Sequence, residues 1–379
     1  MIRIDEVRDW GALERHAETW NALARASATA TVFQSYEWHD AWWRVFAEDY
    51  ELRVLLAHEG GRPVAIAPWA VSRGGRELLF IGSGDYASDY CDFLVDPAHP
   101  EAVDAFAEWM FANRAAWRRV DLRNVPSASP HRGRLEARVR ERSPWLFSEV
   151  EADAPTRLLG DAAADRGVVN KSSLKRHFKQ FSKTGRLAFE HLDAAAQIEP
   201  LLESFFAQHV ERRALAGGRS QFLDPRQRRF YRELVRRLAP RGWLRFAVVR
   251  LDGEPIAFHL GFEYRSCFVW YKPAFSAAHA RRSPGEVLLK YLLEDAIARG
   301  LAEFDFTVGN EPFKYRFANQ VRTNHRVRVY ALPAGYWLRR ARGLAKRLLR
   351  RAPARPTAAG DAPLGAACAS RGPSVSRAD

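Results

Sequence analysis

The chain has 379 residues, of which 47% are hydrophobic and 12% aromatic. This composition excludes an intrinsically disordered protein and suffices for two domains with hydrophobic cores. The formal net charge is +14, but residues 334–379 hold ten Lys or Arg and two Asp, so they supply +8 and the rest of the chain only +6. The rest of the chain also does not have the interleaved aromatic and basic residues of a nucleic-acid-binding surface.

The first half of the chain begins with an amphipathic helix, predicted over residues 36–46 (YEWHDAWWRVF). Its rings Trp38, Trp42 and Phe46 recur at i, i+4 and i+8, and we expect them to pack in the core. Residues 53–71 then form two apolar strands around a glycine-containing turn, which indicates a β-hairpin.

An apolar strand at residues 78–81 leads into a loop, residues 82–92 (GSGDYASDYCD), that combines small residues with carboxylates and phenols. Carboxylate and phenol oxygens bind hydroxyl and ammonium groups well. One interpretation is a substrate-binding loop for a polar acceptor, and the other is a turn whose aspartates face water. The candidate substrate-binding residues are Asp85, Asp89, Tyr90 and Asp92.

The second half repeats the plan of the first. Residues 244–262 form another predicted hairpin, whose turn glycine Gly253 aligns with Gly61 at an offset of 192. Later in each half an apolar strand carries an aspartate, Asp121 and Asp305, at an offset of 184. Offsets this close suggest two copies of one α/β unit, although hairpins with glycine turns are common enough to resemble one another by chance.

The segment 153–160 is polar and contains a proline, so we predict the domain boundary there. It divides the chain into a first domain, residues 1–152, and a second, residues 153–333. A basic helix over residues 334–351 and a tail over residues 352–379 follow. The tail is rich in Ala, Pro, Gly and Ser and is expected to be disordered.

The segment 267–317 is the most informative part of the second half. It predicts an aromatic strand, a capped helix start and a short strand around Asp305. At the helix start, Ser283 suits the N-cap, Pro284 the first helical position, and Glu286 a capping box. Free backbone N–H groups there, with Gly285 and the basic Arg281 and Arg282, form a candidate anion site. The alternative is an ordinary helix start with two solvated arginines.

This order of elements resembles the acyl-CoA-binding core of the GNAT acyltransferases, and more narrowly the FemAB-like, cellulose-biosynthesis type of acetyltransferase domain. The resemblance also rests on residues 33–38 (FQSYEW), 222–225 (FLDP) and 313–317 (FKYRF), and spans roughly residues 30–330. The turn ArgArgSerProGly differs from the glycine-rich turn of typical GNAT enzymes. Cofactor binding is therefore inferred from its position and from the properties of a helix start.

The resemblance implies an α/β (α+β) fold of two tandem GNAT-like domains, each a mixed central sheet flanked by helices. It implies an acyl-CoA-dependent N-acyltransferase, with acetyl-CoA or another acyl-CoA as co-substrate and no metal. The acceptor would be an amino group of a polysaccharide or cell-envelope precursor, held between an acceptor-side first domain and an acyl-CoA-side second domain.

The reaction needs a base for the amine proton, donors for the oxyanion and an acid for the leaving thiolate. In the GNAT-like scheme the strand around residues 271–275 supplies backbone donors. Glu311 is the candidate base, Lys314 positions the acyl or acceptor group, and Tyr271 is the candidate acid, while a surface-loop role for Glu311 stays open. The candidate cofactor-binding residues are Arg281, Arg282, Ser283, Gly285 and Glu286.

Two other functions remain open. One is a FemAB-type transferase that takes its acyl group from aminoacyl-tRNA, and the other is a non-catalytic, membrane-associated partner of a polysaccharide-synthesis complex. The three scattered cysteines and the absence of a signal-peptide pattern predict a cytoplasmic protein. The isolated histidines do not have metal-ligand spacing.

The C-terminal helix predicted over residues 335–351 (GYWLRRARGLAKRLLRR) carries an apolar stripe and no acidic residue. A purely cationic polar face is the pattern of a helix that lies on anionic lipid. We therefore expect peripheral contact with the inner face of the membrane, with a terminal helix packed on the second domain as the alternative.

Overall fold

A computed structural model of the protein describes residues 2–84 and 87–341. Thirteen strands form one mixed sheet with the order β1-β2-β3-β4-β6-β13-β7-β12-β11-β10-β9-β8, and β5 pairs with β3. The strands are β1 (Arg3–Val7), β2 (Tyr50–Glu59), β3 (Arg62–Ser72), β4 (Glu77–Phe80), β5 (Leu94–Val95), β6 (Arg119–Pro126), β7 (Leu146–Leu158), β8 (Leu187–Leu192), β9 (Leu244–Leu251), β10 (Glu254–Tyr264), β11 (Cys267–Phe275), β12 (Glu303–Asp305) and β13 (Gln320–Tyr330).

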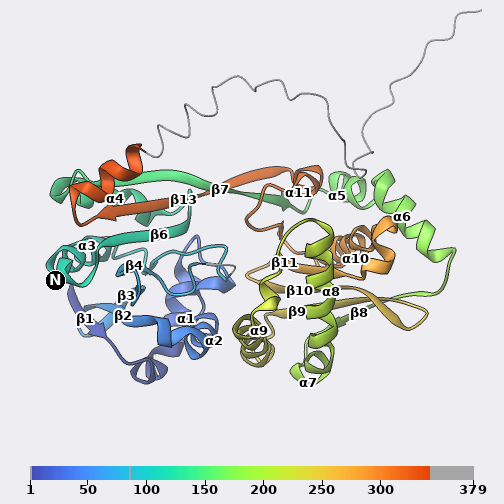
Figure 1. Cartoon of the computed structure of the whole chain (residues 1–379), viewed down its shortest axis with the longest axis horizontal. Helices are drawn as coiled ribbons and strands as arrows, with labels where there is room; N and C mark the ends of the chain where they lie inside the picture. The colour runs from blue at the N-terminus through green and yellow to red at the C-terminus, as the bar shows by residue number, and fades with distance from the viewer. Residues whose placement is uncertain (1, 85–86, 342–379) are drawn as a thin grey trace, which may run out of the picture. The chain divides into compact units, whose positions relative to one another are not determined.

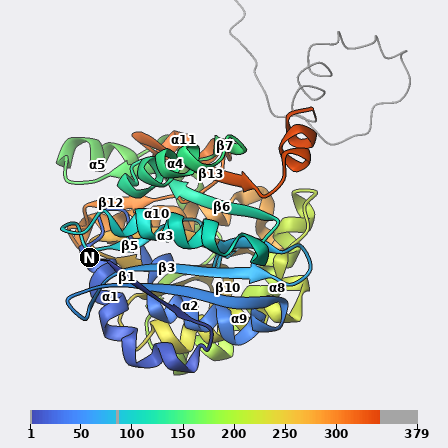
Figure 2. The ribbon, with the colours of Figure 1, turned by 90° about the vertical axis from the view of Figure 1, so that its left-hand side faces the viewer.

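Helices cover both faces of this sheet. They are α1 (Ala17–Ala26), α2 (Tyr36–Phe46), α3 (Ala102–Ala112), α4 (Pro130–Arg142), α5 (Ala162–Val169), α6 (Ser172–Ser182), α7 (Ala195–Ile198), α8 (Leu202–Leu215), α9 (Pro225–Leu238), α10 (Pro284–Ala298) and α11 (Pro312–Phe317). In the first half, α1 and α2 lie on one face of β1–β3 and α3 lies on the other (Figure 2). Alternate strand residues supply the two apolar faces: Leu56 contacts the core below α2, and Leu55 the core below α3.

The two halves have the same topology, as the sequence repeat predicted. The hairpin β2–β3 corresponds to β9–β10, and in each half the strand after the hairpin pairs in parallel with a later strand, β4 with β6 and β11 with β12. The strand order therefore reads the same from either edge of the sheet. This arrangement confirms the predicted α/β fold with two GNAT-like halves.

The halves are joined by an exchange of strands. Strand β7 belongs to the first half in sequence but pairs with β12 of the second, and β13 pairs with β6 of the first. The two exchanged strands also pair with each other along most of their length, and Figure 1 shows them running side by side across the molecule. The predicted boundary at residues 153–160 is therefore wrong as a linker, because β7 continues through it to Leu158.

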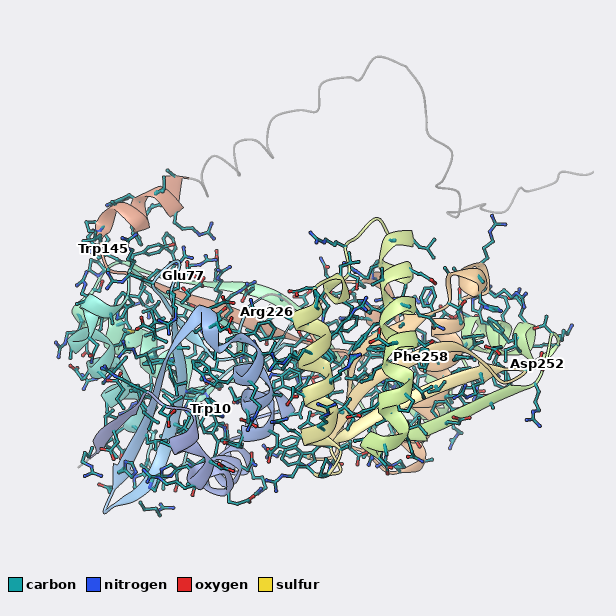
Figure 3. All side chains as sticks on the ribbon, turned by 60° about the horizontal axis from the view of Figure 1, so that its bottom comes forward. Trp10, Glu77, Trp145, Arg226, Asp252 and Phe258 are labelled. Carbon is teal, nitrogen blue, oxygen red and sulfur yellow. The ribbon has the colours of Figure 1, made fainter. Side chains whose placement is uncertain are left out.

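Helices α2 and α9 form an apolar contact between the halves. Trp38 of α2 is fully buried, and its ring meets Phe230 of α9 edge to face with 5.5 Å between centroids. Charged pairs flank the contact: Arg226, labelled in Figure 3, donates to Asp49 at 2.6 Å, and Arg237 donates to Asp40 at 2.6 Å. The core packing expected of Trp38, Trp42 and Phe46 is confirmed.

Residues 1–336 form one compact unit, and a second unit begins at Trp337. Residues 333–341 are helical, which agrees with the start of the predicted basic helix, and Trp337 and Leu338 are exposed. The rest of that helix and the tail at 352–379 lie outside the described residues. Within residues 2–84 and 87–341, no helix combines the length and the apolar character needed to cross a membrane.

Candidate functional site

The candidate site lies where β11 separates from β12. The two strands pair only from Cys267 to Val269, and β11 then continues alone on this side to Phe275. The carbonyl oxygen of Trp270 accepts a hydrogen bond from Thr307 Oγ1 at 3.1 Å, so this edge of β11 faces the loop that follows β12. Because backbone groups alternate along a strand, the backbone of Lys272 faces the same way.

The opposite edge of β11 is held by a buried histidine. The side chain of His259 enters a bulge between β10 and β11, where its Nε2 accepts the backbone N–H of Tyr271 at 3.0 Å. A Cβ at Gly261 would lie 2.5 Å from the carbonyl oxygen of Val269, so the bulge requires glycine there. The expected row of oxyanion donors near 271–275 is therefore reduced: the N–H of Tyr271 is occupied, and Pro273 has none.

A cavity of about 700 Å³ opens beside this gap. Both halves line it, which is the arrangement expected for an acceptor held between them. All three predicted catalytic residues line it, with the predicted acceptor-binding residue Asp89 on the facing wall. Its other polar lining residues include Arg123, Glu151, His209, Arg212, Arg213, Arg219, Lys272 and Thr307.

Lys314 and Glu311 lie together at the start of α11. The buried ammonium of Lys314 donates to the carbonyl oxygen of Val308 at 2.8 Å and pairs with Glu311 at 3.1 Å. Burial raises the pKa of Glu311, but the charge and hydrogen bond of Lys314, a backbone hydrogen bond and the charge of Arg212 together outweigh it, so the pKa lies below its usual range. The carboxylate is thus ionised at neutral pH and is a weak base, which argues against the predicted role of Glu311.

The hydroxyl of Tyr271 serves a structural purpose. It accepts from the hydroxyl of Tyr231 at 3.1 Å and donates to the carbonyl oxygen of Ala87 in the first half. Burial, with Tyr231 and Asp89 nearby, raises its pKa well above the usual value. A phenol so held is a poor donor of a proton to a leaving group, so the structure does not favour the predicted acid role.

The start of α10 differs from the predicted cap. Ser283 has a φ of 57°, and its side chain forms no capping hydrogen bond. The carboxylate of Glu286 accepts from Arg316 at 2.5 Å, so the predicted capping box is wrong, although Pro284 does occupy the first helical turn. The candidate cofactor-binding residues do not line the cavity. A Cβ at Gly285 would lie 3.4 Å from the ring of Phe275, and the cavity-lining Arg212 lies over that ring at 5.8 Å.

Replacing Arg281 and Arg282 together by alanine is expected to weaken coenzyme A binding by roughly tenfold per arginine, with turnover of bound substrate nearly unchanged. Arg281 is exposed, and Arg282 lies over the ring of Phe181 beside Thr184, so both can reach a phosphate that does not react. Such contacts bind ground state and transition state alike. Titration calorimetry checks this, with Arg62→Ala as the control, and unchanged affinity would remove the phosphate site from this helix start.

The loop at residues 82–92 divides between two environments. Asp89 faces the cavity, and burial raises its pKa against the opposing charges of Lys272 and Lys314. Tyr90 points away from the cavity and donates to the buried Asp305 at 2.9 Å. Asp92 is buried and accepts from Thr29 at 2.8 Å, so it does not line the cavity as predicted. Asp85 lies outside the described residues.

Asp305 has a structural role. Besides the bond from Tyr90, its carboxylate accepts the backbone N–H of Thr307 at 2.7 Å, and burial raises its pKa to about 6. Elsewhere, on the first half, Glu59, His99 and Glu101 bring ligand atoms within 4.8 Å of one another, although the sequence showed no metal-ligand spacing. The carboxylates of Glu59 and Glu101 lie 3.1 and 3.3 Å from Nδ1 of His99, which are hydrogen-bonding distances.

Sequence reasoning missed the cations that line the cavity from α8 and β11. Burial lowers the pKa of Arg212 to about 10, and its Nε is buried without a partner among the described residues. Lys272 interrupts an otherwise apolar strand, CFVWYKPAF, and that interruption was the available signal. His209 is buried, and burial lowers its pKa to about 2. Arg212 lies on an ordinary amphipathic helix, so no local pattern marked it.

Residues 170–315 match the acetyltransferase (GNAT) domain family. The fold is similar to that of FemX (TM-score 0.60, 10% identity, 88% of this chain and 99% of that one) and to the C-terminal domain of a putative lysylphosphatidylglycerol synthetase from Agrobacterium fabrum (0.53, 14%, 86% and 94%). It is also similar to a tandem GNAT protein from the clavulanic acid biosynthesis pathway (0.50, 13%, 88% and 99%).

No curated protein matches the sequence. At identities this low, the similar structures establish the fold alone. The family match covers the half that contains α10, β11 and the cationic wall of the cavity, and the similar folds cover most of the chain. The chain therefore contains a segment, residues 170–315, that matches the acetyltransferase (GNAT) domain, within a fold similar to those of FemX and a tandem GNAT protein.

Proposed function

We propose that the protein is an acyl-CoA-dependent N-acyltransferase, acting on an amino group of a polysaccharide or cell-envelope precursor. One observation carries the proposal: the gap between β11 and β12 opens into a cavity lined by both halves, whose Arg212 lies over Phe275, the last residue of β11. The acceptor class rests on the resemblance to FemAB-like proteins. Binding to the cytoplasmic face of the membrane through residues 335–351 is a further part of the proposal.

The geometry suits attack of an amine on a thioester. The α10 start and its arginines would hold the pyrophosphate, and β11 would guide the acyl chain toward the gap. The backbone N–H of Lys272 is the donor best placed for the thioester oxygen, since its neighbours at 271 and 273 cannot serve. The acceptor amine would enter from the wall that carries Asp89.

Aminoacyl-tRNA is a second candidate acyl donor, because the cavity holds cationic side chains that form no ion pair among the described residues. Arg212, Arg213, Arg219 and Lys272 line the cavity, and none lies within ion-pairing distance of a described carboxylate. Such a wall suits the phosphates of either donor. Binding of tRNA would weaken steeply with salt concentration, because it releases many counterions.

Calorimetry with acetyl-CoA and transfer of a labelled acetyl group to glucosamine and to peptidoglycan precursors test the proposal together. We expect saturable acetyl-CoA binding that the Arg281/Arg282 double variant weakens, and a labelled amide product. Transfer from aminoacyl-tRNA without acetyl-CoA binding would establish the second donor instead. Absence of both activities would leave a non-catalytic partner as the function.

A further inference from the structure

Lys272 differs from the other lysine of the cavity. Its ammonium lies 4.0 Å from the centroid of the Tyr271 ring, in the cavity, with no ion pair to a described residue. Lys314, by contrast, is held by Glu311 and by two carbonyl oxygens. An amine that is not held by a carboxylate can lose its proton and turn its lone pair toward a ligand.

The charged groups around Lys272 favour its neutral form. Lys314 on α11, and Arg212 and Arg213 on α8, face it from two sides, and Asp89 from the first half is the opposing charge. Burial is the largest effect, and together with these cations it lowers the pKa of Lys272 to about 8. The neutral amine is therefore present in a useful fraction near neutral pH.

The other candidate bases of the cavity suit the reaction less well. Glu311 is a weak base because Lys314 lowers its pKa. The Nδ1 of His209 is engaged in a hydrogen bond with Ser220 Oγ at 2.8 Å. Burial raises the pKa of Asp89, but the positive charges of Lys314 and of Lys272 itself act in the opposite direction and stabilise the carboxylate. Lys272 alone combines a position at the separation of β11 and β12 with a lone pair available near neutral pH.

We propose that Lys272 is the general base of the transfer reaction, an inference that rests on the proposed function. The acceptor nitrogen bonds to the acyl carbon, the carbon–sulfur bond breaks, and the nitrogen proton moves to neutral Lys272 Nζ. The resulting ammonium then gives that proton to the coenzyme A thiolate, which restores the amine. With an aminoacyl ester as donor, the ribose oxygen takes the place of the sulfur.

The first test reads Lys272 directly and needs no acceptor. Trace labelling with acetic anhydride across pH 6 to 11, followed by peptide mass spectrometry, reports the fraction of each lysine that is neutral. We expect Lys272 to gain reactivity at least one pH unit below Lys179, an exposed lysine of α6. Parallel curves for the two lysines would overturn the proposal.

The second test uses acetyl transfer to glucosamine as the probe reaction. Wild-type kcat/KM should rise with pH through about 8, because the neutral amine is the active form. Lys272→Arg keeps the charge but cannot give up its proton, so it should lose about a hundredfold in kcat and retain coenzyme A affinity. Lys272→Ala should recover activity when small primary amines are added, and Lys179→Ala should resemble wild type.

The outcomes separate the inference from the function on which it rests. A wild-type protein that binds and transfers no acyl group refutes the proposed function. An active wild type whose Lys272→Arg variant retains its rate and its pH profile refutes the role of Lys272 alone. Loss of coenzyme A affinity in Lys272→Arg with unchanged turnover would make Lys272 a binding residue, and that too would overturn the proposal.

Discussion

Replacing Trp38 by alanine is expected to lower the free energy of unfolding by about 3–5 kcal/mol, the usual cost of removing a buried tryptophan. The ring is fully buried between the halves and lies 4.7 Å from Phe33 and 5.8 Å from Tyr271, centroid to centroid. Its Nε1 also donates to Ser88 Oγ at 2.9 Å, so the variant leaves a buried hydroxyl without this donor.

Chemical denaturation followed by circular dichroism measures this loss. Trp337→Ala is the matched control, because that ring is 53% exposed and its removal should change stability by less than about 0.5 kcal/mol. Trp38 contacts Tyr271 beside the cavity, so the alanine variant should lose more activity than its unfolded fraction alone would explain. A cost below about 1 kcal/mol would show that the halves do not depend on this contact.

Replacing Lys314 by methionine is expected to lower turnover by roughly a hundredfold, the cost of a misplacement of about 1 Å in the groups that surround the reaction. The ammonium fixes the loop after β12 through the carbonyl oxygens of Thr307 and Val308, and it balances the charge of Glu311. Without the ammonium, the loop after β12 loses these two hydrogen bonds, and the carboxylate of Glu311 loses its ion pair with Lys314.

Single-turnover rates and calorimetry with coenzyme A separate the two effects. The variant should retain coenzyme A affinity, because Lys314 lines the cavity, whereas the proposed phosphate-binding residues at the start of α10 do not. Glu311→Gln serves as the comparison: it removes the carboxylate charge and leaves the carbonyl contacts of Lys314 in place. If Lys314→Met were as active as wild type, the conformation of the loop would not depend on the lysine, and Lys314 would have no role in the reaction.

Much of the fold could be read from local patterns. The hairpins around Gly61 and Gly253 and the aromatic face of Trp38 follow from alternation and helical spacing, which act over a few residues. The exchange of β7 and β13 could not be read in this way. It pairs Gln320 with Thr156, and no local pattern specifies a partner so far along the chain.

The site was predicted in part for the same reason. Glu311 and Lys314 lie in one short segment, so the sequence placed them together. The capping box failed because Ser283 takes a left-handed conformation and Arg316, thirty residues on, takes the carboxylate of Glu286. Arg212 and Lys272 meet only through tertiary packing, and their lowered pKa values arise from that packing.

The exchange of strands has a consequence for the order of events during synthesis. The first half closes its sheet only when β13 pairs with β6, and β13 ends at Tyr330. On the ribosome, β6 therefore keeps an open edge until residues up to 330 have emerged. Exposed strand edges invite pairing with other chains, so the nascent first half should be the form of this protein that most needs a chaperone.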